Sequence, residues 1–468
     1  MDPQSRSDFF SICATAAILL VVQTAFECAE PVTEFVSSHA RVVVPPFVDR
    51  RCGRKEWTSR NTFVRKNYKD NHWWRMIEGR LHHDIRTTDG RDFRNNFRIP
   101  ASFFDNIVTW FKDNSWTVRE WDKWGRASVP LELKILATFE MLGRGVPAAV
   151  PAGLIGCDPK TIKNFYHLFC RKVALHLKHL HIKFPGNIAE IRACVATYAE
   201  ENLPGCLGSI DCVHVPWPKA LASQRSWFVG KEGAPTVAFQ VIVNHKRKIL
   251  SVSRPHPGAH NDKTIASMDP ALHSIRTLQI FITFAWQACT AVGSATIHGV
   301  YLICDGGYHF WRVLQRCNAV VSEPRQLFLM NRIASARKDV ECTFGILKSR
   351  FRVLKTPLLD AELSNVDDVF ITCAIFHNML LDHDSADFED NGLLDDATAA
   401  RSGVSRTTDY SGVARPPAGY WLGSHAEATH LKLRAQLSDH LYYSHRAASS
   451  PAPRSNVPAT PDTVQRRY

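Results

Sequence analysis

The sequence lacks the cysteine patterns that mark a disulfide scaffold or a zinc finger. Its 468 residues include 13 cysteines, but no CxxC pair occurs and no Cys/His cluster has the spacing of a zinc finger. The odd number of cysteines also argues against a framework of paired disulfides. These absences favour a protein of a reducing compartment. No internal repeat is evident either.

Basic residues are scarce at the N-terminus, where a secretory leader would carry them. The apolar stretch at residues 9–26 follows MDPQSRSD, which contains two acidic residues and one Arg. We expect residues 1–47 to be an apolar segment and linker, either a buried helix or sequence translated from a wrongly chosen start. We expect no stable membrane association; a signal peptide or membrane anchor at residues 9–26 is the alternative.

The composition as a whole indicates a folded chain with a basic balance. Hydrophobic residues make up 45% of the sequence, and 57 Lys and Arg stand against 45 Asp and Glu. A chain of this length and composition can bury a sizeable core and is expected to hold about two or three domains. The basic balance favours a polyanionic partner such as nucleic acid.

Residues 48–195 are expected to form a basic helical region. Between residues 48 and 98, 14 Lys and Arg outnumber 7 Asp and Glu, and aromatic residues are interleaved with them. Such a mixture suits phosphate contacts, although a solvated basic face over an ordinary core explains it as well. The segment RIPASFFDNIVTWFKDN then predicts an amphipathic helix that starts near Pro100 and Ser102.

A pattern like a helix-turn-helix follows at about residues 130–178. One apolar-periodic helix ends at GRG, a short segment follows, and a last helix starts with Asp158 as N-cap and Pro159 in its first turn. The positions of this last helix expected to bind DNA are Lys160, Thr161, Lys163 and Asn164, and those expected to pack inward are Ile162, Phe165, Leu168 and Phe169. Helix pairs joined by Gly turns also occur without DNA, so a purely structural role is open.

From about residue 196 onward the hydrophobic period changes to that of strands. GCLGSIDCVHVPW predicts a strand with Asp211 near its end, and PTVAFQVIVNHKRKILSVSRPHPG predicts a hairpin whose turn is NHKRK. HNDKTIASM starts a helix capped by Asn261 or Asp262. A further apolar strand at residues 300–304 is followed by Asp305 and two glycines.

One carboxylate, Glu341, stands among cations and large apolar residues in RKDVECTFGILKSRFRVL, residues 337–354. The simplest role for this carboxylate is an ion pair with Arg337 one turn earlier, which is worth only about 0.2–0.5 kcal/mol. The apolar residues recur every three or four positions and predict a helix with one buried stripe, formed by Val340, Phe344, Leu347, Phe351 and Leu354.

Asp211, Asp305 and Glu341 converge at one end of the sheet if the two strands are neighbours and the helix packs across them. Three oxygen ligands without Cys or His favour a hard cation, Mg²⁺ or Mn²⁺. Two such ions about 4 Å apart can activate a water molecule and stabilise the leaving oxygen of a phosphoryl displacement. Taken singly, each Asp is explained as well by a strand-end cap.

Four motifs occur in order: SIDCVHVPWPKALASQRSWFVGKEGAPTVAFQVIVNHKRKILSVSRPHPGAHNDKTI, GVYLICDGGYHFW, ARKDVECTFGILKSRFRVLKTPL and FITCAIFHNML. Together, over about residues 205–383, they resemble the nuclease domain of PIF/Harbinger-type transposases, the plant-type branch of the DDE superfamily endonucleases. The resemblance implies an α/β fold: a ribonuclease-H-like mixed sheet with flanking helices at residues 196–383, preceded by an α-helical helix-turn-helix-like region. It places the family's metal-binding triad on Asp211, Asp305 and Glu341.

The resemblance also implies a function, that of a divalent-metal-dependent DNA endonuclease and transposase in the nucleus. Such an enzyme cleaves double-stranded DNA at the terminal repeats of its element and joins the 3′-hydroxyl ends to a target site. It uses Mg²⁺ or Mn²⁺, as two ions, and works with a separately encoded Myb-like DNA-binding partner protein. Whether this chain forms a homo-oligomer is open. The alternative is a domesticated, non-catalytic DNA-binding or scaffold protein on the same fold.

Neighbours of the triad receive secondary roles. His260 and Asp262, in the motif GAHNDKTI, are expected to support the site rather than to bind the metal. Arg337, Lys338 and Lys348 are expected to approach the phosphate backbone.

The C-terminal part, residues 384–468, is acidic at first and then rich in Ser, Pro and Ala. This composition predicts a mostly disordered tail with a short helix near residues 430–443.

Overall fold

The structure is a computed structural model, and it describes residues 67–116, 127–317, 323–391 and 425–449. All of these residues belong to one structural unit. The apolar stretch at residues 9–26 and the first part of the basic segment, residues 48–66, lie outside the described residues.

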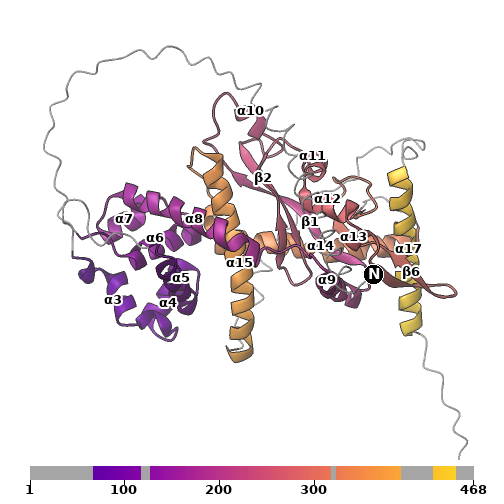
Figure 1. The fold of residues 1–468 in the computed structure, drawn as a ribbon, viewed down its shortest axis with the longest axis horizontal. Helices are drawn as coiled ribbons and strands as arrows, with labels where there is room; N and C mark the ends of the chain where they lie inside the picture. Colours follow the sequence, from indigo (N-terminus) through magenta and orange to yellow (C-terminus); the bar gives the residue numbers. More distant parts are fainter. Residues whose placement is uncertain (1–66, 117–126, 318–322, 392–424, 450–468) are drawn as a thin grey trace, which may run out of the picture. The chain divides into compact units, whose positions relative to one another are not determined.

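Short helices make up the first described part of the chain (Figure 1). Two of them begin at side-chain caps, where Asn71 accepts a hydrogen bond from Trp73 N (2.8 Å) and Thr87 from Gly90 N (3.1 Å). The helix predicted after Pro100 is present as α5. In chain order the elements are η1 (Tyr68–Asp70), α3 (His72–Glu78), η2 (Leu81–His83), α4 (Thr88–Phe97) and α5 (Ala101–Asp113).

The helix pair predicted at about residues 130–178 is formed by α6 (Leu131–Arg144) and α8 (Pro159–His181), with α7 (Ala149–Ile155) between them. Asp158 caps α8, since its Oδ1 accepts a hydrogen bond from Lys160 N at 2.7 Å. Ile162, Phe165 and Phe169 are buried as predicted. The prediction for Leu168 is wrong: its side chain is 43% exposed, because Tyr166 takes the inward position on that turn.

The main sheet is mixed and runs in the order β3-β2-β1-β7-β8, with β4 paired to β2. The antiparallel pairs β1–β2 and β2–β3 include the predicted hairpin, and the pairs β1–β7 and β7–β8 are parallel. A second, two-stranded sheet of β5 (Ala285–Thr290) and β6 (Gly293–His298) was not predicted. The main strands are β1 (Cys206–Pro216), β2 (Thr236–Val243), β3 (Ile249–Val252), β4 (His256–Pro257), β7 (Tyr301–Cys304) and β8 (Leu314–Arg316).

Alternate residues of the strands face different helices, as the two-residue period of a strand requires. Ile210, Ile242 and Leu302 pack in one apolar cluster with α9 (Ile188–Glu200) and α12 (Pro270–Thr277). Val213 and Val241 belong to another cluster with α14 (Pro324–Arg350) and α15 (Leu363–Asn391). The short helices between the strands are α10 (Arg225–Phe228), α11 (Asp262–Ser267) and α13 (Gln279–Ile282).

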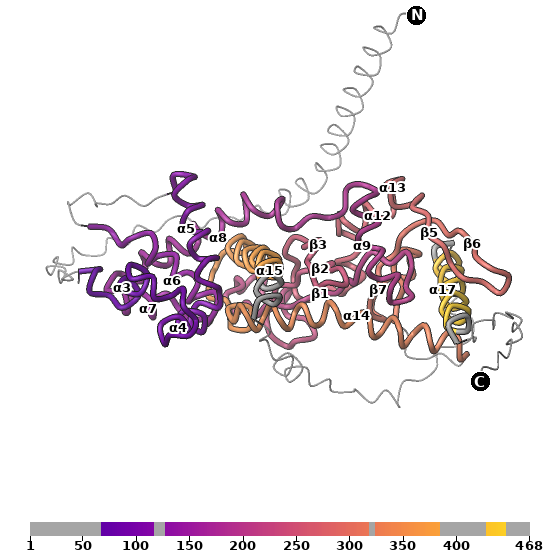
Figure 2. Tube along the Cα trace, turned by 90° about the horizontal axis from the view of Figure 1, so that it is seen from below, coloured from indigo at the N-terminus to yellow at the C-terminus, as the bar shows by residue number. Residues whose placement is uncertain are grey.

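Helix α14 carries the predicted apolar stripe and passes along β1 and β7 (Figure 2). Val340, Leu347, Phe351 and Leu354 are buried and Phe344 is partly buried, as predicted. The helix ends at Arg350, earlier than expected, and Leu354 lies in the short helix η3 (Arg352–Leu354).

The C-terminal helix predicted near residues 430–443 is present but longer, as α17 (His425–Ser449). Leu433, Leu437 and Leu441 are buried in a cluster that also contains Leu329 and Ile333 of α14. Residues 425–449 thus form a packed helix where one was predicted, and the helix extends beyond the expected limits at both ends. Within the described residues, no helix combines the length and the apolar character needed to cross a membrane.

Candidate active site

The pairing of β1 with β7 sets Asp211 and Asp305 level with each other. The two strands are parallel, and Ser209 pairs with Ile303. Each Asp lies two residues further along its own strand direction, and side chains two residues apart point to the same face. Ile303 and Ser209 both approach α14: Ile303 packs in a cluster with Ile333, and Ser209 Oγ donates to the Ala336 carbonyl at 3.3 Å. The two carboxylates therefore lie on the face of the sheet that α14 covers.

Asp262 brings another carboxylate to the same place. It is the first residue of α11, which Asn261 caps by accepting a hydrogen bond from Thr264 N at 2.8 Å. A Cβ added to Gly307 would lie 2.8 Å from Asp262 Oδ2 and 3.1 Å from Asp305 Oδ1, so both carboxylates close over this glycine. Gly307 N also donates to Asp305 Oδ1 at 2.9 Å. The glycine that follows the strand thus leaves room for two acidic side chains.

Arg337 joins Asp211 to Glu341. Its Nη1 lies 3.5 Å from Asp211 Oδ2, and its Nη2 lies 2.6 Å from Glu341 Oε1. Both Arg337 and Asp211 are only 21% exposed, whereas Glu341 is 48% exposed. Burial alone would lower the pKa of Arg337, but the negative charges of Glu341, Asp211 and Asp305 raise it above its usual value. The two strands and the helix therefore lie together, and Arg337 stands between Asp211 and Glu341. Among the described residues, the oxygens of Asp211, Asp305 and Glu341 do not all lie within 4.8 Å of one another.

Asp211 is the most perturbed of these acids. Burial raises its pKa to about 7; Asp305 and Asp262 add to the rise, while the Cys212 N–H and Arg337 oppose it. The Cys212 N–H donates to Asp211 Oδ1 at 2.8 Å. An ionised Asp211 is thus costly in this place even with Arg337 beside it, and a further cation would reduce that cost. A cluster of carboxylate oxygens with one buried, electrostatically strained member fits a hard divalent cation such as Mg²⁺ or Mn²⁺.

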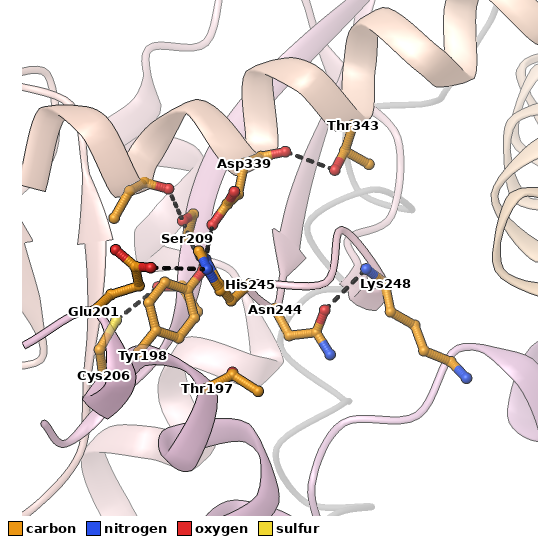
Figure 3. A network of polar contacts seen from close by, with 12 residues as sticks. Thr197, Tyr198, Glu201, Cys206, Ser209, Asn244, His245, Lys248, Asp339 and Thr343 are labelled. Atoms are coloured by element: carbon orange, nitrogen blue, oxygen red, sulfur yellow. Dashed lines mark hydrogen bonds and ion pairs between the residues drawn. The ribbon is translucent and has the colours of Figure 1, made fainter. Parts of the chain in front are cut away.

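A polar network around Asp339 holds the part of α14 between Arg337 and Glu341 (Figure 3). This network was not predicted from the sequence. Asp339 Oδ2 lies 2.7 Å from Nδ1 of His245, in the turn between β2 and β3, and 3.4 Å from the Tyr198 hydroxyl on α9. Tyr198 in turn lies 3.1 Å from Ser209 Oγ on β1. Burial raises the pKa of Asp339, although His245 opposes the rise. The network ties the helix that carries Glu341 to the strand that carries Asp211.

The two predicted supporting residues differ in position. Asp262 lies beside Asp305, as described above. His260 is half-buried; its ring centroid lies 6.2 Å from that of His256, and its Nδ1 makes no hydrogen bond within the described part of the chain. The structure therefore brings Asp262, but not His260, into contact with the carboxylate cluster.

The residues expected to contact DNA fall into two groups. On α8, Lys160, Lys163 and Asn164 are exposed and Thr161 is half-buried, and Lys163 Nζ lies 3.8 Å from Asp360 Oδ1. These residues stand on the side of α8 opposite its buried stripe.

Arg337, Lys338 and Lys348 of α14 form the second group, and they differ in how far their charges face solvent. Lys338 is exposed, whereas Arg337 is held by carboxylates and Lys348 Nζ donates to the His214 carbonyl at 2.9 Å. Burial lowers the pKa of Lys348. The ion pair of Arg337 with Glu341 was predicted, but the contacts of Arg337 with Asp211 and of Lys348 with His214 were not, because both partners lie on the distant strand β1.

Comparison with known proteins covers the part of the chain that carries this site. Residues 183–388 match the plant transposon protein family, and this range contains Asp211, Asp262, Asp305 and Glu341. The human "Putative nuclease HARBI1" is 24% identical over 206 residues, covering 43% of this chain and 54% of that protein. The cattle protein of the same name is 22% identical over the same shares. The chain thus spans about half the length of these relatives, and no solved structure matches it. Residues 183–388 are thus similar to plant transposon proteins and to these two nucleases, in line with the PIF/Harbinger-type transposases that the motifs resemble.

Proposed function

We propose that this protein is a divalent-metal-dependent DNA endonuclease and transposase. The observation that carries the proposal is the matched position of Asp211 and Asp305 on parallel neighbouring strands, with Glu341 joined to them through Arg337. The mixed sheet with its helices is proposed to be a ribonuclease-H-like nuclease domain at residues 196–383. The relatives whose names describe them as nucleases support the same class of reaction.

In this proposal Asp211, Asp305 and Glu341 hold two Mg²⁺ or Mn²⁺ ions, and Asp262 supports Asp305. The ions, when bound, supply an activated water and positive charge against the scissile phosphate. The strands fix the separation of Asp211 and Asp305, and the Asp339–His245 contact fixes the turn of α14 that carries Glu341. The chain itself needs no nucleophilic side chain, because water attacks the phosphodiester and a 3′-hydroxyl is the leaving group. That hydroxyl then attacks the target strand.

The DNA is proposed to bind the basic helical region, residues 48–195, through Lys160, Thr161, Lys163 and Asn164 at the start of α8. Lys338 is exposed on α14 and is proposed to contact the phosphate backbone near the carboxylates. The substrate is double-stranded DNA with the terminal repeats of the element. A Myb-like partner protein, self-association and a nuclear location complete the proposal.

The test is cleavage of DNA duplexes that carry the terminal repeats flanking the gene, with Mg²⁺ or Mn²⁺ present. Asp211→Asn, Asp305→Asn and Glu341→Gln should each lower cleavage by at least about a thousandfold, because each removes metal-binding charge and keeps side-chain shape. Asp382→Asn is the matched control, since this exposed acid lies in the same region and pairs only with Lys248 among the described residues. It should cleave like wild type.

Two results would count against the proposal. Cleavage that persists in all three variants would place the chemistry elsewhere. A wild-type protein that binds the repeats, with the partner protein supplied, but cleaves under no metal condition would support the alternative, a domesticated DNA-binding or scaffold protein.

A further inference from the structure

We propose that His82, His83 and Asp105 form a binding site for one Zn²⁺ ion, outside the carboxylate cluster of the sheet. One donor atom from each of these residues lies within 4.8 Å of the donor atoms of the other two. The residues come from η2 and from α5, in the helical part of the chain. The proposal does not depend on the nuclease reaction, and it concerns a different class of metal.

His82 presents a lone pair to this place. Its side chain is 2% exposed and packs against Phe93 and Phe104, with ring centroids at 5.2 and 6.0 Å. Its Nδ1 lies 3.3 Å from the Met76 carbonyl, which can only accept, so a neutral ring that makes this hydrogen bond carries its proton on Nδ1. Nε2 is then an acceptor; it is buried and has no hydrogen-bond partner within the described residues.

The carboxylate of Asp105 faces His82 Nε2, and its oxygens are also acceptors. His82 Nε2 lies 3.6 Å from Asp105 Oδ1, beyond hydrogen-bond distance. A buried acceptor facing a carboxylate oxygen is unfavourable unless a cation lies between them. The bond from Nδ1 to a backbone carbonyl is also the contact that commonly orients a histidine ligand from its far side.

His83 and Asp105 complete a half-open set of donors. His83 Nε2 lies 2.8 Å from Asp105 Oδ2, and the two side chains are 36% and 39% exposed. Zn²⁺ bonds of about 2.0–2.2 Å in a tetrahedron put donor atoms about 3.3 Å apart, between the observed 2.8 and 3.6 Å. The exposed side gives the ion an entry path and leaves the fourth position to water.

The donor set selects the metal. Two imidazole nitrogens and one carboxylate suit Zn²⁺, whereas the oxygen-only cluster of Asp211, Asp305 and Glu341 suits Mg²⁺ or Mn²⁺. The segment that carries the histidines is already held in shape, since His83 N donates to the Arg80 carbonyl at 3.2 Å and Thr87 Oγ1 donates to the Leu81 carbonyl at 3.4 Å. An ion here would join η2 to α5 through bonds that the packed side chains do not supply.

The test is Zn²⁺ titration of the full chain in competition with a coloured chelator, after metal is stripped from the protein. The titration uses the background Asp211→Asn/Asp305→Asn/Glu341→Gln, so that the carboxylate cluster does not contribute. We expect one tight equivalent of Zn²⁺, and Co²⁺ in its place should give the visible absorption of a tetrahedral site. Asp105→Asn and His83→Gln should each weaken Zn²⁺ binding by more than the roughly 10–100-fold loss that follows changes behind a ligand.

His72→Gln is the matched control, because His72 is an exposed histidine on α3 and is not one of the three donors. His83 and Asp105 are more than one-third exposed, so their variants should keep the fold, and circular dichroism verifies this. The proposal is overturned if the folded background protein binds no Zn²⁺. It is equally overturned if Asp105→Asn and His83→Gln bind the ion as tightly as His72→Gln does.

Discussion

Arg337 occupies the place where positive charge is most needed in the candidate active site. Its guanidinium contacts Asp211 and Glu341 while Asp305 adds to the negative field around it. An arginine and a divalent cation neutralise the same carboxylates, so the two compete for them. If the proposed metal site is correct, Arg337 must release at least one carboxylate when the ions bind. Substitution of Arg337 should therefore distinguish the stabilisation that the arginine provides from the stabilisation that the metal ions provide.

We predict that Arg337→Gln lowers the free energy of unfolding by about 1–3 kcal/mol in EDTA, because half-buried carboxylates lose their charged partner. Adding Mg²⁺ should then raise the melting temperature more in Arg337→Gln than in wild type, since the ions meet no competing cation. Thermal unfolding with and without Mg²⁺ measures both effects. Lys338→Gln, an exposed neighbour, is the control. An equal Mg²⁺ response in wild type and Arg337→Gln would contradict the competition.

At the scale of single residues, the sequence predicted which residues belong to the site but not all of their long-range contacts. Asp211, Asp305 and Glu341 were predicted as a group from the strands and the helix expected to carry them and from the resemblance of the motifs. The ion pair of Arg337 with Glu341 was also predicted, but the contact of Arg337 with Asp211 was not, since it depends on the distance between a helix and a strand. Lys348 bonds to a carbonyl 134 residues earlier, and no local pattern records that contact. The proposed zinc site could not be predicted either. His82 and His83 do not have the spacing of a zinc finger, and Asp105 lies near them only because the chain folds.

Elements were predicted well where they follow a clear period and poorly where tertiary packing decides their limits. The buried strands β1, β2 and β7 and the hairpin turn agree with their apolar runs and turn residues. The separate two-stranded sheet β5–β6 was missed, because several of its side chains are exposed and its apolar pattern is weak. Helix α17 was predicted too short, since its buried leucines are spaced among charged residues and pack on α14.

Helix α17 is also where we expect acid to act first. His430 is fully buried, and its Nδ1 lies 3.1 Å from the Trp311 carbonyl. Burial lowers the pKa of His430 from 6.5 to about 4, and Arg434 and Arg316 add to the decrease. The unfolded chain therefore binds a proton that the folded chain excludes between these two pH values. The stabilisation is present above pH 6.5 and is lost as the pH falls towards about 4.

We predict that wild type loses about 2 kcal/mol of unfolding free energy between pH 7.5 and pH 5 through this histidine. His430→Gln should have a flatter pH profile over the same range, whatever its absolute stability. Urea unfolding at several pH values measures the slope, and hydrogen exchange in residues 425–449 should rise in acid. His273→Gln, at an exposed histidine, should keep the wild-type slope. An unchanged slope in His430→Gln would assign the acid sensitivity to other groups.

At the scale of the whole molecule, the proposal assigns different tasks to different parts of the chain. The start of α8 presents exposed basic and polar side chains, while the sheet and α14 present clustered acids. If the proposed function is correct, a formal net charge of +12 attracts DNA to the chain, but the carboxylate cluster repels the phosphate that is to be cleaved. Phosphate contacts elsewhere must therefore supply the affinity, and cations at the carboxylates must remove the repulsion. Binding and cleavage should then respond to different substitutions.

We predict that Lys160→Gln weakens DNA binding and reduces the dependence of log Kd on log salt concentration by about one, as expected for one lost phosphate contact. Lys163→Gln should have a smaller effect, because Lys163 already lies 3.8 Å from Asp360. Binding titrations over a range of salt concentrations measure both slopes. Lys432→Gln, an exposed lysine on α17, should leave the slope unchanged. At saturating DNA, the Lys160→Gln variant should cleave at the wild-type rate. The substitution weakens DNA binding but leaves the carboxylate site unchanged. If the Lys160 variant keeps the slope of the Lys432 control, the start of α8 is not the DNA-binding surface, and the basic residues before it become the next candidates.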